Sequence, residues 1–319
     1  MKNIYSNIIK FNSKNLIKII KILKKNGVIG LPTETVYGLA GNAYSNNAIK
    51  KIFKVKKRVK KNPLIIHYYN LKHAEKDVFL DQKFFKIYKK FSPGPITYIV
   101  KKKRNSRIKS LACANLKTVG IRFPKNKIIR KLLKKLSFPL AMPSANKSSG
   151  VSPVKPLDVF EEFDNKIKVV DGGISRIGIE STVLNLVGII SILRPGIITP
   201  KQIENVLKIK IKISSKQKSI KSPGSLKKHY SPDIPMYINK EKCPKKYAFI
   251  TFGKKYPVTR NSFNLSRKSN LNEAARNLYK FFRIIKKKGY KRIYVVKIPN
   301  KGVGLAINDR LKRASKQWN

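Results

Sequence analysis

Two segments of the chain combine small hydroxyl side chains in a way that suits the binding of a polar ligand. The first, GLPTETVYGLAGNA (residues 30–43), contains no Lys or Arg, although the whole chain has 73 of them against 15 Asp and Glu. Its Thr33, Glu34 and Thr35 follow an apolar run, and ligand-binding residues of α/β folds often follow the end of a strand. The second, MPSANKSSGVSP (residues 142–153), joins hydroxyls, an amide and a glycine, so its backbone N–H groups can approach a phosphate or carboxylate. A capping turn around a buried Glu34 and an ordinary serine-rich turn are the alternatives.

A third segment, KVKKRVKKNPLIIH (residues 54–67), has the composition of a phosphate grip. Arg suits bidentate contact with phosphate, whereas Lys acts as a point charge. Asn62, Pro63 and His67 interrupt the basic run and favour this interpretation. The alternative is a solvated basic surface, which is common in so basic a chain.

Two arginines interrupt apolar strands. Arg122 lies in GIRFP and Arg194 in LRPG, and a fourth polar segment, GIESTVLNL (residues 178–186), enters a strand of its own. An unpaired cation in an apolar place is costly, and the chain offers few acids to pair with it. This shortage favours an anion from outside, with a structural salt bridge as the alternative; a structural strand entry is the alternative for GIESTVLNL.

The apolar periodicity predicts the elements that must hold these segments. Helices are expected over residues 16–23, 46–56, 82–91, 127–136 and 200–207, strands at 28–32, 63–69, 96–102, 118–123, 138–143 and 168–173, and a hairpin over 180–196 that turns near 188. Strands in both directions with helices between them predict an α/β domain with a mixed, twisted sheet. Neither GxGxxG after a strand nor GxxxxGK[ST] occurs, so the two common nucleotide loops are missing.

The chain changes character after residue 208. Residues 209–233 are rich in Lys, Ser and Pro and are predicted to form a linker. Strands near 247–253 and 292–298 then alternate with helices over 271–288 and 305–315, which predicts a small, Rossmann-like α/β domain. The predicted division is therefore 1–208, 209–233 and 234–319.

Composition restricts the classes of protein that remain. A net charge of +58 can mark a nucleic-acid surface, but lysines run from Lys2 to Lys316, which favours compositional drift; either way the field attracts anions such as nucleotides. Cys113 and Cys243 are the two cysteines, which argues against a thiolate zinc site and a disulfide framework. No signal peptide or apolar run of about 18 residues is present, so we expect no membrane span and a cytoplasmic location.

Eight short motifs together carry a family resemblance. PTETVYGL, KxR followed by NPL, SPGPIT, RFP, PSAN, DGG, GIESTV and LRPG occur in this order. Over residues 27–207 the chain closely resembles the YrdC/YwlC family of threonylcarbamoyl-AMP synthases. SPGSLKKHYSP and the tail segment GVGLAINDRL resemble the long form of that family, which carries an extra C-terminal domain. Val59 stands where the family commonly has Pro, which weakens the expectation that Arg58 is rigidly held.

The resemblance implies a nucleotidyltransferase with a YrdC-like catalytic domain. It would make L-threonylcarbamoyl-AMP and pyrophosphate from L-threonine, bicarbonate or CO2, and ATP. The product would pass to a separate tRNA threonylcarbamoyl transferase complex for modification of tRNA; direct tRNA binding is compatible with this but not required. Mg²⁺ is expected with the ATP, with no protein-bound cofactor, and the resemblance names no metal ligand.

The resemblance also implies a set of site residues. Those expected to contact L-threonine are Thr35, His67, Arg122, Met142, Ser181 and Thr182. Those expected to hold ATP are Lys56, Arg58, Asn62, Thr118, Ser144, Asn146, Ser152 and Arg194, with His229 and Tyr230 of the linker folding back as part of a lid. Glu34 and Glu180 are expected to be structural partners of arginines.

Two other functions compete with this one. A carbamoyl transferase of the hydrogenase-maturation type uses a related domain, but such proteins are far longer and carry zinc-binding CxxC pairs, which this chain lacks. A non-catalytic RNA-binding protein is the second; it would bind with a steep salt dependence and without ATP turnover.

Overall fold

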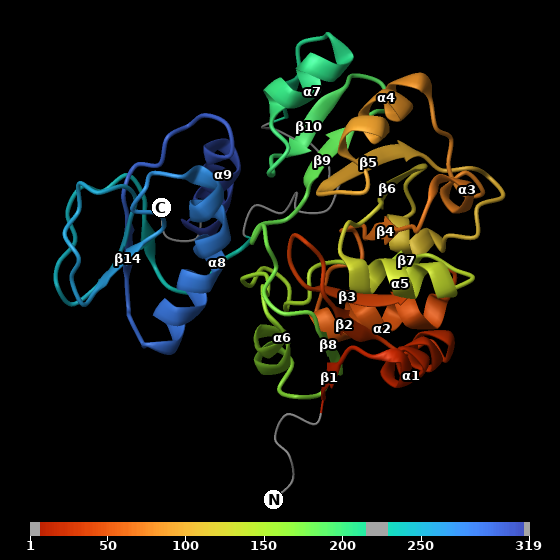
Figure 1. The fold of residues 1–319 in the computed structure, drawn as a ribbon, viewed down its shortest axis with the longest axis horizontal. Helices are drawn as coiled ribbons and strands as arrows, with labels where there is room; N and C mark the ends of the chain where they lie inside the picture. The colour runs from red at the N-terminus through yellow and green to blue at the C-terminus, as the bar shows by residue number, and fades with distance from the viewer. Residues whose placement is uncertain (1–6, 215–228, 316–319) are drawn as a thin grey trace, which may run out of the picture.

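The computed structural model describes residues 7–214 and 229–315, which form two α/β domains side by side (Figure 1). The large domain contains an 11-stranded sheet and the small one a 4-stranded sheet. Both were predicted as α/β, and the prediction is confirmed. Residues 215–228 of the predicted linker lie outside the described residues.

The large sheet mixes parallel and antiparallel neighbours, as the sequence predicted. Its strands, in spatial order, are β1 (Ile8–Lys10), β8 (Val169–Asp171), β2 (Ile29–Leu31), β3 (Gly38–Asn42), β7 (Leu140–Ala141), β4 (Ile65–His67), β6 (Thr118–Arg122), β5 (Ile96–Lys101), β9 (Thr182–Asn185), β10 (Ser191–Arg194) and β11 (Lys212–Ile213). β4 and β6 run parallel, whereas β5 and β6 run antiparallel. The predicted hairpin is formed by β9 and β10, with Gly188 at a positive φ of 72° between them.

The helices of the large domain begin where the sequence provides caps. They are α1 (Ser13–Lys24), α2 (Asn46–Lys56), α3 (Leu71–Ala74), α4 (Gln82–Phe91), α5 (Lys127–Lys135), α6 (Pro156–Glu162) and α7 (Pro200–Leu207), with a 3₁₀ helix at Ser110–Cys113. Ser45 caps α2 by accepting a hydrogen bond from the Ala48 N–H, which satisfies one of the donors that a helix start leaves free. α2 buries Ile52 and Phe53 and ends at the basic segment that contains Arg58.

Some elements were not predicted. β3 has the sequence GLAGN, and its first four residues are buried, so it lacks the alternation that marks a strand. β11 adds a short strand to the large sheet within the range predicted as linker. β1, α3 and α6 were also missed because each is seven residues or shorter and offers little periodicity.

The small domain has an all-parallel sheet. Its strands, in spatial order, are β12 (Met236–Tyr237), β15 (Ile293–Val295), β13 (Ala248–Thr251) and β14 (Ser262–Asn264), and its helices are α8 (Leu271–Lys287) and α9 (Gly304–Ser315). Parallel neighbours require crossover connections, which α8 supplies between β14 and β15. This agrees with the predicted Rossmann-like arrangement.

One hydrophobic core is shared by the two domains. Val36 and Ile179 of the large domain are buried in the same cluster as Leu278 and Phe282 of α8. Gly178 makes this contact possible, because a Cβ there would lie 2.5 Å from the backbone of α8 and its φ is +83°. The small domain therefore packs directly on the segments that carry Thr35 and Glu180.

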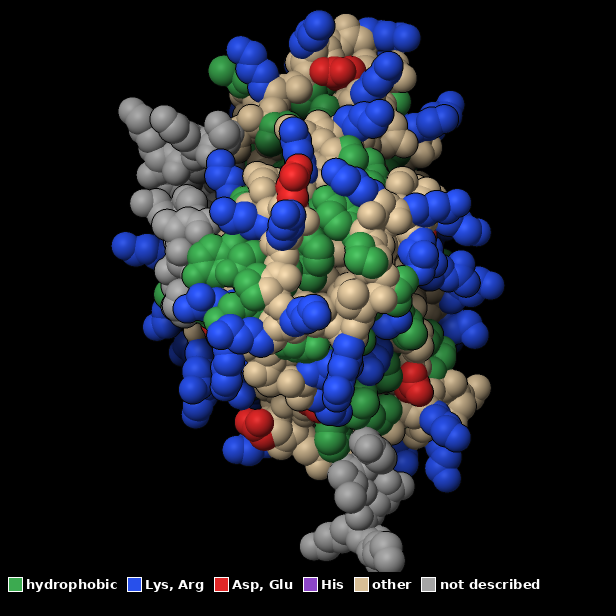
Figure 2. All heavy atoms as spheres, turned by 90° about the vertical axis from the view of Figure 1, so that its left-hand side faces the viewer, with side chains coloured by type: hydrophobic (Ala, Val, Ile, Leu, Met, Phe, Trp, Pro, Cys, Tyr) green, Lys and Arg blue, Asp and Glu red, His purple; other side chains and the backbone are tan. Residues whose placement is uncertain are grey.

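The basic side chains are widely distributed. On the face shown in Figure 2, Lys and Arg lie over the whole surface, with apolar side chains between them, and do not gather into one patch. This distribution agrees with compositional drift for that face. Across residues 7–214 and 229–315, the helices are too short or too polar to cross a lipid bilayer.

Candidate functional site

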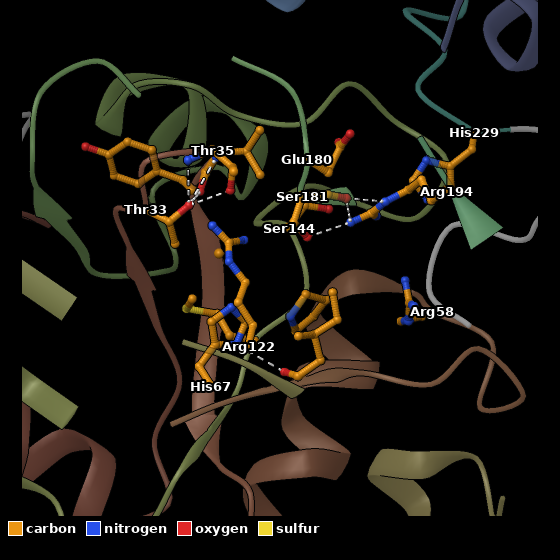
Figure 3. Close-up of a pocket in the computed structure, with 16 residues that line it drawn as sticks. Thr33, Thr35, Arg58, His67, Arg122, Ser144, Glu180, Ser181, Arg194 and His229 are labelled. Carbon is orange, nitrogen blue, oxygen red and sulfur yellow. Dashed lines mark hydrogen bonds between the residues drawn. The ribbon is translucent and has the colours of Figure 1, made fainter. Parts of the chain in front are cut away.

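A polar cavity lies where several loops and strand ends of the large domain meet (Figure 3). It is lined by the turn after β2, the loop after α2, the ends of β4, β6 and β10, the segment after β7 and the entry to β9. Nine of the predicted site residues line it: Thr35, Arg58, His67, Arg122, Met142, Ser144, Ser181, Arg194 and His229. The structure thus brings together residues that are up to 194 positions apart in the sequence.

The other seven predicted site residues lie outside the lining. The side chains of five of them hydrogen-bond to the protein, and four of these five bond to residues that line the cavity. Lys56 is buried and donates to the carbonyls of Ser144 and Asn146. Thr182 Oγ1 donates to the Ile198 carbonyl, 2.8 Å away. The backbone and side-chain oxygens of Asn62 accept hydrogen bonds from Arg58. The side-chain oxygen of Asn146 accepts from the Ser144 hydroxyl, and the Ser152 hydroxyl donates to Glu180.

Two residues that were predicted to hold ATP, Thr118 and Tyr230, neither line the cavity nor form a hydrogen bond to a lining residue among the contacts of the described structure. Thr118 begins β6, at the opposite end of that strand from Arg122, and it does not line the cavity. Tyr230 is fully buried beside His229, with ring centroids 4.0 Å apart. In the described structure, therefore, Tyr230 lies behind the lining residue His229.

The turn after β2 is held by its own hydroxyls. Thr33 Oγ1 donates to the Val36 carbonyl (2.6 Å) and accepts from the N–H groups of Thr35 and Val36. Gly38 follows, where a Cβ would lie 2.4 Å from the Met142 side chain. Residues 30–43 are buried apart from the half-buried Asn42, which explains why the segment contains no lysine: an ammonium there would lose its hydration without gaining a partner.

His67 and Arg122 are brought side by side by strand pairing. They end the parallel neighbours β4 and β6 and are partners in the register. Arg122 Nη2 donates to Glu34 Oε1 at 2.7 Å, so the expectation that Glu34 pairs with an arginine is confirmed. Burial, and next to it the charge of Arg122, lowers the pKa of His67 well below its usual range, which leaves the imidazole neutral.

Two further arginines face the cavity without a carboxylate partner among the hydrogen bonds of the described residues. Arg58 donates to the Asn62 and Pro63 carbonyls at 3.0 and 2.9 Å, and Arg194 donates to the Ser181 carbonyl at 3.0–3.1 Å. Burial, and then the repulsion of Arg194, lowers the pKa of Arg58 to about 9. Two buried cations that repel each other form a site for an anion.

Glu180 is the carboxylate that lines the cavity, and its partners come largely from the small domain. Its oxygens accept hydrogen bonds from Ser152, Tyr279 and Arg310. Burial raises the pKa of Glu180, but Arg310 and then Arg194 lower it, and the net value is about 2. The expectation that Glu180 pairs with an arginine is confirmed. Tyr279 and Arg310 were not predicted as residues of the site, although Arg310 lies in the tail segment GVGLAINDRL that carried part of the family resemblance.

Unpartnered polar atoms also gather at this site. Buried polar groups in proteins are almost always hydrogen-bonded. Within the described residues, six buried side-chain atoms have no hydrogen-bond partner, and four of the six are Asn62 Nδ2, Arg122 Nε, His229 Nδ1 and Tyr230 OH. These four groups line or adjoin one cavity, which indicates that the cavity is built for a polar ligand that supplies the missing partners.

His229 provides a test of how the cavity is closed. Burial lowers the pKa of its imidazole to about 3; the charge of Glu180 opposes this, and those of Arg58 and Arg194 add to it. An exposed imidazole takes up a proton below about pH 6.5, so the buried arrangement is favoured above that pH and loses stability as the pH falls toward 3.

We therefore expect the His229 imidazole to remain neutral from about pH 7.5 to about pH 5.5 in the protein without ligands. The ¹H–¹³C signals of the imidazoles measure this, with His229→Ala to assign the resonance. A midpoint near pH 6.5 would contradict burial of His229 over the cavity.

The residues that could bind a metal are few. Within residues 7–214 and 229–315, no group of three or more His, Cys, Asp and Glu side chains is placed to hold a metal ion. Of the residues that the structure describes, Glu180 alone offers a carboxylate to the cavity, and both of its oxygens already accept hydrogen bonds. A divalent cation in this cavity must therefore find most of its ligands on a substrate or on water.

Comparisons with known proteins agree over most of the chain. Residues 21–196 match the Sua5_yciO_yrdC family, described as "Telomere recombination", and residues 198–316 match the family described as "Threonylcarbamoyl-AMP synthase, C-terminal domain". A protein of Pyrococcus abyssi named threonylcarbamoyl-AMP synthase is 34% identical, and the match covers 92% of this chain and 92% of that protein. A Bacillus subtilis protein of the same name is 33% identical, over 95% of this chain and 94% of that protein. The crystal structure of P. abyssi Sua5 complexed with L-threonine matches at a TM-score of 0.89 and 31% identity, over 98% of each chain.

Proposed function

The chain belongs to the Sua5/YrdC family of threonylcarbamoyl-AMP synthases, and from this premise we propose that its cavity is the active site of a nucleotidyltransferase. The enzyme converts L-threonine, bicarbonate or CO2, and ATP into L-threonylcarbamoyl-AMP and pyrophosphate. The observation that most supports this is the meeting of nine motif residues at one cavity. The carboxylate of an amino acid and the phosphates of ATP are both anionic, and among the described residues three arginines line the cavity.

The amino-acid end of the cavity lies around Arg122. With Nη2 held by Glu34 and Nε unpartnered, the guanidinium is oriented and still has a donor for the L-threonine carboxylate. Thr35, fully buried beside it, offers a hydroxyl, and the neutral His67 does not repel the substrate's ammonium. Together these groups select a small zwitterion.

The phosphate end lies around Arg58 and Arg194. Each guanidinium is already oriented by backbone carbonyls, so little reorganisation is needed when charge develops on the phosphates. Lys56 supports the PSAN segment from behind through the carbonyls of Ser144 and Asn146. We assign to Lys56 the shape of the nucleotide pocket, because it holds these two carbonyls.

The reaction then needs positioning more than acid–base groups. The threonine amine attacks CO2, forms the N–C bond and releases a proton to give a carbamate. A carbamate oxygen attacks the α-phosphorus of ATP, the bond from that phosphorus to the bridging oxygen breaks, and pyrophosphate leaves with the electron pair. Holding carbamate and phosphate in line, and neutralising the phosphate oxygens, supplies the rate enhancement.

Mg²⁺ enters this site with ATP. Because Glu180 is engaged with Arg310, Tyr279 and Ser152, the phosphates and water would provide the ligands of this ion, and its charge would neutralise part of the phosphate charge. We further propose that the enzyme acts in the cytoplasm and passes its product to a tRNA threonylcarbamoyl transferase complex. Direct tRNA binding is not required for the chemistry.

The decisive test is substrate-dependent release of pyrophosphate. With ATP, Mg²⁺ and bicarbonate, release should need L-threonine, and L-serine should serve much less well. Release that is independent of the amino acid would indicate a simple ATPase, and no release, with RNA binding of steep salt dependence, would indicate the RNA-binding alternative.

Thr35→Val should weaken L-threonine binding about 10-fold or more, because a buried polar group of the substrate loses its partner. Calorimetric titration of L-threonine measures the effect. Thr35→Ser, which keeps the hydroxyl, is the matched control and should remain near the wild type. Equal affinities of the wild type and the valine variant would place the amino acid elsewhere.

A further inference from the structure

Arg310 of α9 links the small domain directly to the active site. It is fully buried and contacts three segments of the site at once. Its Nε and Nη2 donate to Glu180 Oε2 at 3.2 and 3.1 Å, and its Nη1 donates to the carbonyl of Pro195, next to Arg194. Its guanidinium also lies 5.2 Å from the ring centroid of Tyr230, next to His229.

The carboxylate of Glu180, which Arg310 holds, carries a negative charge that is unfavourable for the binding of phosphates. Glu180 lines the same cavity as Arg58 and Arg194, where the proposed function places the phosphates. An uncompensated carboxylate there would repel phosphate and attract Arg194. Arg310 supplies the opposite charge at hydrogen-bond distance, while Arg194 remains bound to the backbone of Ser181.

Resting on the proposed function, we propose that Arg310 is a positioning residue of the nucleotide site: it neutralises and orients Glu180 so that Arg194 stays available to ATP. Tyr279 of α8 assists, because its hydroxyl lies 3.0 and 3.1 Å from the two oxygens of Glu180. The small domain thereby sets the affinity of the large domain for ATP. Within the described residues, the hydrogen bonds of Arg310 go to Glu180, Pro195, Ala306 and Asp309 and not to Arg122, His67 or Thr35. The threonine end around Arg122 should therefore be affected much less than the phosphate end.

A purely structural role, in which Arg310 only fastens the two domains together, makes different predictions. The chain offers a matched control in Arg283 of α8, which also joins the domains but elsewhere: its Nη2 donates to the Val151 carbonyl and pairs with Glu162 Oε2 at 3.1 Å. If fastening were the whole role, loss of Arg283 and loss of Arg310 would have similar effects on the site.

The experiment compares full-length Arg310→Met, Arg283→Met, Glu180→Gln and the double variant Glu180→Gln/Arg310→Met. Calorimetry measures the binding of ATP with Mg²⁺ and of L-threonine, pyrophosphate release gives kcat and KM, and thermal unfolding reports the fold. We expect Arg310→Met to weaken ATP binding about 10- to 100-fold and threonine binding less than about 3-fold. The double variant should bind ATP within about 3-fold of Glu180→Gln, because no unpaired carboxylate remains.

The outcomes separate the possibilities. ATP affinity unchanged in Arg310→Met overturns the proposal, as does an equal loss of ATP affinity in Arg283→Met or a double variant as weak as Arg310→Met. If Arg310→Met does not fold, Arg310→Lys and Tyr279→Phe are measured in its place. Arg310→Lys should keep most of the ATP affinity, and Tyr279→Phe should lose part of it. A lower ATP affinity in Arg310→Lys than in Tyr279→Phe overturns the proposal. If the wild type shows no threonine-dependent release of pyrophosphate, the proposed function is contradicted. The ATP affinities of the variants would still test the role of Arg310.

Discussion

Replacing Arg58 by alanine is expected to lower kcat for threonine-dependent pyrophosphate release by about 100- to 1,000-fold, the usual cost of removing one preorganised donor from developing charge. The guanidinium is already oriented by the carbonyls of Asn62 and Pro63, so its contribution to the transition state requires little rearrangement. The alanine variant also leaves Arg194 without the neighbour that completes the anion site. Affinity for L-threonine should change little, because Arg122 and Thr35 are untouched.

Steady-state assays of pyrophosphate release test this, and Lys60→Ala is the matched control. Lys60 is exposed in the same loop, so its removal takes away the same charge without emptying the cavity and should leave kcat within about 2-fold. Arg58→Lys should recover only part of the activity, because an ammonium cannot reproduce a bidentate contact. Wild-type turnover in Arg58→Ala would show that the phosphates bind elsewhere.

Replacing Arg122 by glutamine is expected to raise the KM for L-threonine about 100-fold or more, since a charged hydrogen bond to the substrate carboxylate is lost. It should also destabilise the protein by about 3–5 kcal/mol, because the buried Glu34 loses its ion-pair partner. The two effects have different origins and can be separated.

The separating variant is the double replacement Glu34→Gln/Arg122→Gln. It leaves no unpaired charge, so chemical denaturation should show much of the stability recovered, while the KM for L-threonine stays high. Recovery of both would mean that Arg122 acts only through the local fold. Recovery of neither would mean that the Glu34–Arg122 pair is not the source of the stability loss.

Much of the fold could be predicted because local signals were strong. The helix over residues 46–56 has a serine cap and a clear apolar face, and its bounds agree with the structure. The hairpin of β9 and β10 turns near the predicted Gly188. β3 could not be predicted, because a glycine-rich strand buried on both faces has no alternation to detect.

The residues of the site could be predicted mainly from the order of the motifs along the chain. The motif residues identified Arg58, His67, Arg122 and Arg194 as members of one site, and all four line the cavity. The sequence could not tell lining residues from those that support them: Lys56 and Thr182, predicted as direct contacts, are bonded to protein carbonyls. That distinction depends on a side chain's direction, which spacing along the chain does not encode.

By itself, the sequence determined the class of ligand. Two arginines that interrupt apolar strands in a chain with 15 acids favour anions from outside, and the hydroxyl-rich segments favour a small polar substrate. Only the tertiary structure decided which acids neutralise which cations. Glu34 and Arg122 meet across 88 residues and Glu180 and Arg310 across 130, because sheet register and domain packing create those contacts, and no local pattern records a pairing at such separations.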